Sequence, residues 1–296
     1  MVSNEDQNAL LEVLGRIATA LEAMQPPVQP RPDFEAATAF RWHPAKAAPA
    51  NSRQIQSSGT FEPLKLDALA LEDILGVDEQ KARLMANTQA FARGRWANHA
   101  LLWGARGMGK SSLVKSIVKS ITDEGISIKL IEVSRAALNH LDQLVGFLSE
   151  QPFRYILFCD DFAFEDGDER YRSLKSSLDG SVASRHQNIL IYATSNRRHL
   201  LSRDLGENAG TTATNPGDEV DERISLSDRF GLWLGFPACD QATYLSIVER
   251  HAANFQIALS RDELRDLALK WARTRGARSG RVAYQFVIDL ASQTDR

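Results

Sequence analysis

The segment that most restricts the fold of this chain is residues 104–111, which read Gly-Ala-Arg-Gly-Met-Gly-Lys-Ser and match the pattern GxxxxGK[ST]. The apolar run Ala100–Trp103 precedes this segment, and a helical apolar pattern through Leu113 and Ile117 follows it. Glycines in such a loop let successive backbone N–H groups turn inward around a phosphate, and the start of a helix adds partial positive charge. The sequence therefore predicts a strand, a phosphate-binding loop and a helix within an α/β fold.

Two side chains of this loop have specific expected roles. Lys110 is expected to bridge the β- and γ-phosphates of a nucleoside triphosphate, and the Ser111 hydroxyl to ligate Mg²⁺. The alternative is a glycine turn with an incidental lysine, which the strand, loop and helix context disfavours. The predicted nucleotide-binding residues of the loop are Gly104, Ala105, Arg106, Gly107, Met108, Gly109, Lys110, Ser111 and Ser112.

Two further predicted strands end in polar side chains. Tyr155–Cys159 leads to Asp160, expected to hold magnesium through water, and to Asp161, expected to polarise the attacking water. Ile189–Ala193 leads to Asn196, which either orients that water, if the two strands are neighbours, or merely caps the next helix. We favour the first interpretation. The chain has no Asn-Lys-x-Asp motif for reading guanine, so ATP is preferred over GTP.

Arginines in the last third of the chain are candidates for contacts with the same nucleotide. Arg229 precedes the last predicted strand, and we expect it at the carboxyl-end rim of the sheet, pointing away from its own nucleotide. Such a residue suits the γ-phosphate of a neighbouring subunit, as an arginine finger. The alternative is a surface pair with Asp228. Arg278 and Arg281 open the last helix, and we expect one of them to reach the phosphates, although the sequence does not say which.

Short apolar runs alternate with helical patterns after a helical stretch from Asp78 to Gly94. Continuous apolar strands need shielding on both faces, so the runs predict a five-stranded parallel sheet between layers of helices. From Pro237 onward the pattern is purely helical, near residues 240–256, 260–274 and 279–293, which predicts a small all-α subdomain. The five runs are His99–Trp103, Ser127–Val133, Tyr155–Cys159, Ile189–Ala193 and Gly231–Phe236.

The N-terminal part of the chain is predicted to lie outside this fold. Residues 1–24 carry apolar side chains at an alternating four and three spacing, which favours a helix packed on its own body or on a copy over a dedicated partner-docking helix. Residues 25–65 are rich in Pro, Ala and Ser, so we expect a linker with little regular structure. The nucleotide-binding subdomain then covers residues 66–237, and a helical lid covers residues 238–296.

Composition restricts the partners and the compartment. Lysine and arginine number 35 against 38 acids, a net charge of −3, so any polyanion must bind a local basic patch. Cys159 and Cys239 are the two cysteines, and without a CxxC spacing they argue against zinc and against a structural disulfide. No run of 18 apolar residues occurs, and the acidic N-terminus does not match a secretory signal. We therefore expect a cytoplasmic protein with no membrane contact.

Taken together, these elements resemble those of AAA+ ATPases over residues 66–296. Several longer strings are similar to a bacterial AAA+ group filed as domain of unknown function family 815. These strings are Phe158–Asp161, Tyr192–His199, Ser225–Gly231 and Arg278–Arg281.

The resemblance implies an αβα sandwich with a helical lid, ATP or ADP with Mg²⁺ at a subunit boundary, and assembly into hexamers or open spirals. Most AAA+ enzymes carry Asp-Glu where this chain has Asp160-Asp161. The shorter side chain implies slower water activation, and a similar pair occurs in replication-initiator and helicase-loader relatives, which use ATP binding as a switch. The implied roles are Walker A at Gly104–Ser111, Walker B at Asp160 and Asp161, sensor one at Asn196, the arginine finger at Arg229, sensor two at Arg278 or Arg281, and adenine contacts near Leu75 and Val77.

The features of the sequence bear on three candidate functions. A polypeptide-threading motor is disfavoured because Glu132–Ala137, after the second strand, has no aromatic residue, and packing is the favoured role of Phe162 and Phe164. A nucleic-acid or helicase-loading ATPase is the alternative we retain. We favour a switch that remodels an unknown protein partner recruited by the N-terminal helix and linker. The alternative rests on a run of cations with no acid between them: Lys270, Arg273, Arg275, Arg278 and Arg281.

Overall fold

A computed structural model of the protein describes residues 14–16, 32–45, 59–162, 174, 178, 187–196 and 229–294. The chain divides into two compact units, Met1–Asp33 and Phe34–Arg296. Of the helix predicted over residues 1–24, the structure describes residues 14–16, which are helical. The remainder of that helix, part of the predicted linker and Phe164 lie outside the described residues. No helix within the described part is both long and apolar enough to cross a membrane.

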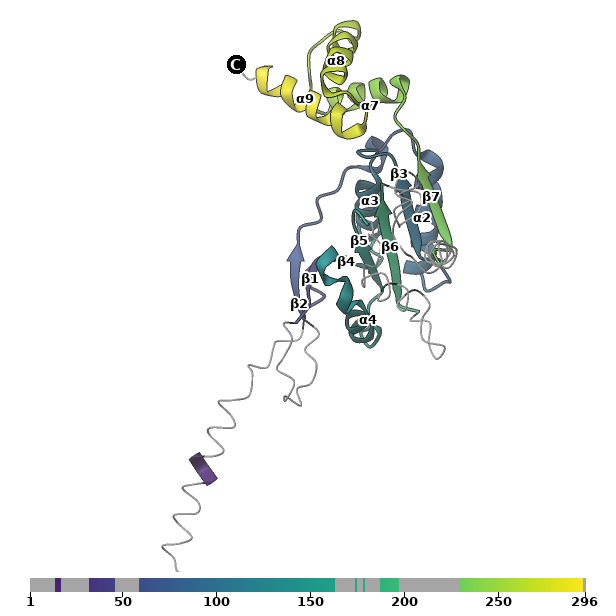
Figure 1. Ribbon diagram of the computed structural model, residues 1–296, viewed down its shortest axis with the longest axis vertical. Helices are drawn as coiled ribbons and strands as arrows, with labels where there is room; N and C mark the ends of the chain where they lie inside the picture. The colour runs from purple at the N-terminus through teal and green to yellow at the C-terminus, as the bar shows by residue number, and fades with distance from the viewer. Residues whose placement is uncertain are drawn as a thin grey trace, which may run out of the picture. The chain divides into compact units, whose positions relative to one another are not determined.

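A seven-stranded sheet forms the centre of the second unit, in the order β2-β1-β4-β5-β6-β3-β7 (Figure 1). Neighbouring strands run parallel except β1 and β2, which pair antiparallel. All five predicted runs are strands of this sheet, so the α/β fold class is confirmed. The strands are β1 (Ala39–His43), β2 (Thr60–Leu64), β3 (Ala100–Gly104), β4 (Lys129–Val133), β5 (Tyr155–Cys159), β6 (Ile189–Ser195) and β7 (Leu232–Phe236).

The expectation of little regular structure between residues 25 and 65 is wrong where the structure describes this stretch. Strands β1 and β2 lie there and extend the sheet from five strands to seven. In β1, Phe40 and Trp42 are buried while Arg41 is exposed, a strand alternation too short to stand out between Pro- and Ala-rich segments. Pro63 is tolerated in β2 because β2 is an edge strand, where a missing N–H breaks no ladder.

Helices cover both faces of the sheet. Residues of α2 (Asp78–Ala92) and α3 (Lys110–Asp123) share one apolar core with the sheet, and residues of α4 (Leu141–Ser149) share the other. Strand β5 contributes to both cores, because Leu157 belongs to the α4 side and Phe158 to the α2 and α3 side. Every residue of β5 is therefore buried, as expected for a central parallel strand.

Three helices after β7 enclose a small core of their own and form the lid (Figure 1). They follow the carboxyl end of β7, so the lid lies at the edge of the sheet where the phosphate loop begins. The backbone N–H of Arg281 donates to the Gly107 carbonyl at 3.1 Å and joins the lid to that loop. The helices are α7 (Gln241–Asn254), α8 (Arg261–Arg275) and α9 (Gly280–Thr294).

The ends of α8 follow from local sequence signals. Ser260 accepts from the Glu263 backbone N–H while the Glu263 carboxylate accepts from the Ser260 N–H, a capping box that starts the helix. Gly276 ends it with a left-handed φ of 66°, which a residue without a Cβ adopts at little cost. The bounds of α8 are thus set by short polar and glycine signals between apolar stretches.

Candidate nucleotide-binding site

A cavity of about 800 Å³ lies between the phosphate loop, the carboxyl ends of β5 and β6, and the lid. Parallel strands deliver their terminal side chains to one edge of a sheet, which is where open α/β sheets bind ligands. Residues Arg106–Ser112 line the loop side of this cavity. Polar side chains from the two strand ends line the next part, and residues of α7 and α9 line the lid side.

Glycines shape the loop that enters the cavity. A Cβ at Gly104 would lie 2.2 Å from the Phe236 carbonyl oxygen, so only glycine allows β3 and β7 to end this close together. Gly109 has a left-handed φ of 84° and immediately precedes α3, which begins at Lys110. The first N–H groups of a helix have no partner within the helix. The loop thus presents unpaired backbone donors and a helix N-terminus to the cavity.

Lys110 is the buried cation of the site, with 7% of its surface exposed. Its Nζ donates to the carbonyl oxygens of Gly104 at 2.9 Å and Ala105 at 2.8 Å, and to Asn196 Oδ1 at 3.2 Å. Burial lowers the pKa of Lys110, and the charges of Asp160 and Asp161 partly oppose that effect. Phosphate oxygens are stronger partners for an ammonium than these neutral oxygens, so a triphosphate in the cavity would compete for Nζ.

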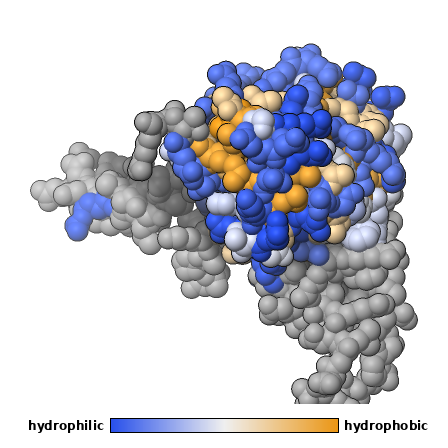
Figure 2. All heavy atoms as spheres, turned by 90° about the horizontal axis from the view of Figure 1, so that it is seen from above, coloured by the Kyte–Doolittle hydropathy of each residue, from blue (hydrophilic) through white to orange (hydrophobic). Residues whose placement is uncertain are grey.

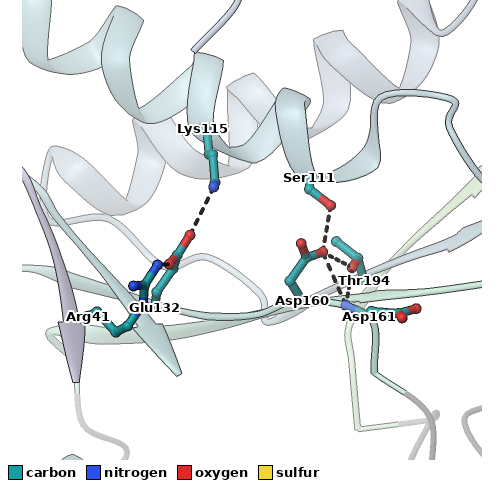
Figure 3. Close-up of polar contacts among 7 residues, drawn as sticks. All are labelled: Arg41, Ser111, Lys115, Glu132, Asp160, Asp161 and Thr194. Carbon is teal, nitrogen blue, oxygen red and sulfur yellow. Dashed lines mark hydrogen bonds and ion pairs between the residues drawn. The ribbon is translucent and has the colours of Figure 1, made fainter. Parts of the chain in front are cut away.

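Asp160 lies where three donors converge on one oxygen (Figure 3). Its Oδ1 accepts from Ser111 Oγ at 2.5 Å, from Thr194 Oγ1 at 2.6 Å and from the Asp161 N–H at 3.1 Å. Thr194 also accepts from the Asp161 N–H at 2.9 Å. The hydroxyl of Ser111 and the carboxylate of Asp160 are therefore adjacent and held in position. Mg²⁺ typically takes one or two such protein oxygens together with substrate phosphates and water, so these residues fit it.

Asn196 joins Asp161 to Lys110 through hydrogen bonds. Its Nδ2 donates to Asp161 Oδ1 at 2.5 Å, while its Oδ1 accepts from Lys110 Nζ. Asp161 has a left-handed φ of 51°, which turns its side chain away from the path of β5. Because β5 and β6 are neighbours, the two strands bring Asn196 to Asp161, as the sequence predicted. The catalytic roles of both residues stay predictions.

A second charged cluster joins β1 to the phosphate-loop helix (Figure 3). Lys115 of α3, which lines the cavity, lies 2.9 Å from Glu132 Oε1, and Arg41 of β1 lies 3.1 Å from Glu132 Oε2. Burial alone would raise the pKa of Glu132, but its bonds and charges with Lys115 and Arg41 lower that pKa overall. The strand that sequence analysis missed thus contacts α3 through one shared carboxylate.

The structure distinguishes Arg281 from Arg278, the two candidates for the lid residue that reaches the phosphates. Arg281 lines the cavity together with Lys110. Arg278 instead donates to Gln241 Oε1 at 3.1 Å and lines a different cavity. Leu75 also lines the nucleotide cavity. Val77 is buried in the core that α2 and α3 share with the sheet, and it is not among the described residues that line the cavity.

The lid side of the cavity contains residues that no sequence motif marked. Ile247, His251 and Tyr284 line it, and the His251 and Tyr284 rings lie 5.3 Å apart. Burial lowers the pKa of His251 despite the opposing charge of Asp73, so the imidazole is neutral at pH 7. An apolar wall with one neutral ring suits a heterocyclic base. These residues lie within α7 and α9, where the sequence showed only an ordinary helical pattern.

The expected position of Arg229 is wrong. Leu232, the first residue of β7, pairs in parallel with Ala100, the first residue of β3. Arg229 therefore lies at the amino ends of these strands, and the phosphate loop lies at their carboxyl ends. The prediction placed Arg229 at the wrong rim because it did not take strand direction into account. Within the described part of the chain, Arg229 is not among the residues that line the cavity.

Comparisons with known proteins identify both family and fold. The sequence model of the family DUF815, described as a protein of unknown function, matches residues 35–294. No curated protein matches the sequence. One variant of RuvB from Thermotoga maritima is similar in structure, with a TM-score of 0.50 and 19% identity over 74% of this chain and 63% of that chain. Another RuvB variant of the same organism gives 0.49 and 19% over 75% and 64%. The chain spans less than two thirds of these proteins, and the likeness shows the fold alone.

Proposed function

This chain belongs to the DUF815 family and has the AAA+ fold, and from this premise we propose that it binds and hydrolyses ATP as an oligomeric switch acting on a protein partner. The observation that carries ATP binding is the convergence of Lys110, Ser111, Asp160 and Asn196 on one cavity. A buried ammonium, a helix N-terminus and adjacent hydroxyl and carboxylate oxygens together suit a triphosphate with its metal. The separate N-terminal unit is our reason for proposing a tethered protein partner.

The proposed division of work follows from the hydrogen bonds. Ser111 and Asp160 would hold Mg²⁺, which would neutralise charge on the β- and γ-phosphates. Asp161 accepts from Asn196 and has a second carboxylate oxygen with which to hold a water. Asn196 in turn contacts Lys110, so the water-holding pair is sensitive to the phosphates that Lys110 binds. Hydrolysis would then depend on a correctly bound triphosphate.

Arg281 is the proposed phosphate contact of the lid. It lines the cavity, and its backbone N–H donates to Gly107 in the phosphate loop. Its charge also acts on Lys110, which places the two cations at the same site. We assign the sensor-two role to Arg281 and not to Arg278 for these reasons.

Arg229 is proposed to act on the nucleotide of a neighbouring subunit. An arginine at the opposite end of the strands from its own phosphate loop can reach a γ-phosphate only when another copy presents one. This geometry favours an assembly in which each site is completed by its neighbour, such as the hexamer or open spiral that the resemblance implies. An arginine finger typically contributes about 10³-fold or more to turnover.

The test is a mixing experiment with two inactive variants. In Lys110→Ala the site cannot bind ATP but Arg229 is intact, and in Arg229→Ala the reverse holds. Each should lose about 10³-fold in ATPase activity. Mixed before assembly, they should recover a measurable fraction of the wild-type rate, because the first variant lends its arginine to the intact site of the second.

The matched control mixes Lys110→Ala with Asp161→Asn, which disable the same site and should not complement each other. The proposal that Arg229 completes a neighbour's site is contradicted if the Arg229→Ala mixture stays as inactive as this control while light scattering detects mixed oligomers. ATP binding itself is tested separately by calorimetry of the wild-type protein with and without Mg²⁺. Absence of any heat of ATP binding to the folded protein would contradict the whole proposal.

A further inference from the structure

The lid separates its charges along α8. In the first half of this helix, Arg261 bonds to both carboxylate oxygens of Glu249 at 3.0 Å, and Arg265 Nε lies 3.3 Å from the same carboxylate. On α7, Arg250 Nε lies 2.5 Å from Asp73. These three arginines are paired with two acids, because Arg261 and Arg265 share Glu249. No acid occurs in the sequence between Asp266 and Asp289, so the second half of α8 and the turn after it carry cations alone.

Four of those cations form what we call the basic surface: Lys270, Arg273, Arg275 and Arg278. All four are exposed, and none forms an ion pair with any residue that the structure describes. Figure 2 looks onto this end of the molecule and shows hydrophilic residues over much of the face, with smaller apolar areas between them. Like charges repel one another, and the charge of Asp240, which interacts with Arg278, offsets this repulsion at one end of the basic surface.

Each of the three guanidinium groups has a neutral partner, and Arg273 Nε donates to the Leu269 carbonyl oxygen at 3.4 Å. Arg275 lies over the Trp271 ring at 4.7 Å, a cation–π contact that leaves its outward N–H groups available. Arg278 donates through one nitrogen to Gln241 Oε1. A planar guanidinium fixed at one side presents a fork of donors on the other, which is the geometry that binds a phosphate through two oxygens.

A recess lies among these cations. Arg273 and Arg278 line a cavity of about 640 Å³, together with Cys239 and with Ala105 of the phosphate loop. The exposed residues between the cations are small or polar, namely Thr274, Gly276 and Ala277. Leu269, Cys239 and several alanines also line the recess, but the cations around it distinguish this surface, because the centre of a protein interface is depleted of charged residues. A polyphosphate needs no apolar centre, because its affinity comes mainly from neutralised charge.

We propose that the basic surface binds the phosphate backbone of a nucleic acid. The proposal goes beyond the ATP site, because none of the four residues lines the nucleotide cavity among the residues described. Because the net charge is −3, the molecule as a whole does not attract a polyanion, and the binding must come from this local surface. One phosphate lies between the guanidinium groups of Arg273 and Arg278, and Lys270 and Arg275 contact the neighbouring phosphates.

The test measures binding of the full-length protein to fluorescent duplex DNA, single-stranded DNA and RNA by anisotropy, between about 50 and 200 mM salt. The triple variant Lys270→Ala/Arg273→Ala/Arg275→Ala should bind at least about 10-fold more weakly. The slope of log affinity against log salt should shrink by up to about 3 for duplex DNA, since each phosphate contact contributes about 0.9. The matched control is Arg261→Ala/Arg265→Ala on the same helix, which should leave affinity and slope unchanged.

Several outcomes overturn the proposal. One is no binding of any nucleic acid at about 50 mM salt. Another is equal affinity of the wild type and the triple variant. Stronger binding of polyglutamate through the same residues would assign the surface to an acidic protein, and a wild-type oligomer that dissociates in the triple variant would make it an interface between copies. ATP binding measured on the same preparations separates failure here from failure of the proposed ATPase function.

Discussion

The two sides of the nucleotide cavity are built in different ways. On the side of the sheet and the phosphate loop, called the base side, Lys110 and Ser111 at the start of α3 donate to Asn196 at 3.2 Å and to Asp160 at 2.5 Å. The two acceptor residues directly follow the adjacent parallel strands β6 and β5. On the lid side, the wall consists mainly of packed rings and aliphatic groups from a separate core, with Arg281 as its cation. The base side is therefore fixed by the backbone of the sheet, whereas the lid side depends on how one helical unit rests on another.

Both polar and apolar contacts join the lid to the rest of the fold near the cavity. The Arg281 N–H donates to the Gly107 carbonyl, and Asp73 accepts from Arg250 and from Asn254 at 2.9 Å. Leu75 packs against the apolar core of the lid, so the position of the lid depends on side-chain packing as well as on these bonds. Substitutions on the base side should therefore abolish ATP binding, while substitutions on the lid side should weaken it or change its selectivity.

The largest effect is expected for Lys110→Ala. This change removes a charge that would bond to at least two phosphate oxygens, each such bond contributing about 1.5 to 3 kcal/mol. ATP affinity measured by calorimetry should fall by about 100-fold or more. Lys119→Ala is the matched control, because Lys119 lies on the same helix and pairs with Asp123 on the surface. A similar loss in both variants would mean that the effect comes from general charge and not from the loop.

Arg281→Ala should have an intermediate effect that depends on the nucleotide. A lid arginine that reaches the γ-phosphate strengthens ATP binding but not ADP binding. We expect ATP affinity to fall by about 10-fold, the value of one charge-assisted hydrogen bond, with ADP affinity nearly unchanged. Arg278→Ala is the matched control, because Arg278 bonds to Gln241 outside this cavity. If Arg278→Ala shows the selective loss instead, the two assignments must be exchanged.

The same contrast explains what the sequence could and could not predict. The base side is encoded by contiguous residues: a glycine loop between a strand and a helix, and carboxylates at a strand end. Lys110, Ser111 and Asp160 line one cavity because local backbone geometry carries them there, while their roles stay predictions. His251 and Tyr284 reach it only through the packing of α7 and α9 on the base, for which one sequence shows no signal.

Two other differences have equally specific causes. The sheet was predicted with five strands because Ala39–His43 and Thr60–Leu64 are short and flanked by residues typical of linkers. The rim assigned to Arg229 was wrong because a residue that precedes a strand of a parallel sheet lies at the amino ends of the strands, opposite the phosphate loop. The predicted parallel sheet already implied that position.

The smallest expected effect concerns the lid side and pH. His251 is 4% exposed and its pKa is lowered from the ordinary 6.5, by burial first, with Arg250 acting in the same direction and Asp73 against it. As pH falls below that ordinary value, the unfolded chain takes up a proton that folded His251 resists until its lower pKa is reached. Folding stability should therefore decline across this window.

In His251→Gln this part of the decline is absent, so its Tm should fall by a few degrees less than that of the wild type between about pH 7 and 5. The Tm difference between the two proteins at about pH 8 serves as the reference, since His251 is neutral there in both the folded and the unfolded wild-type chain. Parallel Tm curves across the acid range would contradict a buried neutral imidazole on the lid side of the cavity.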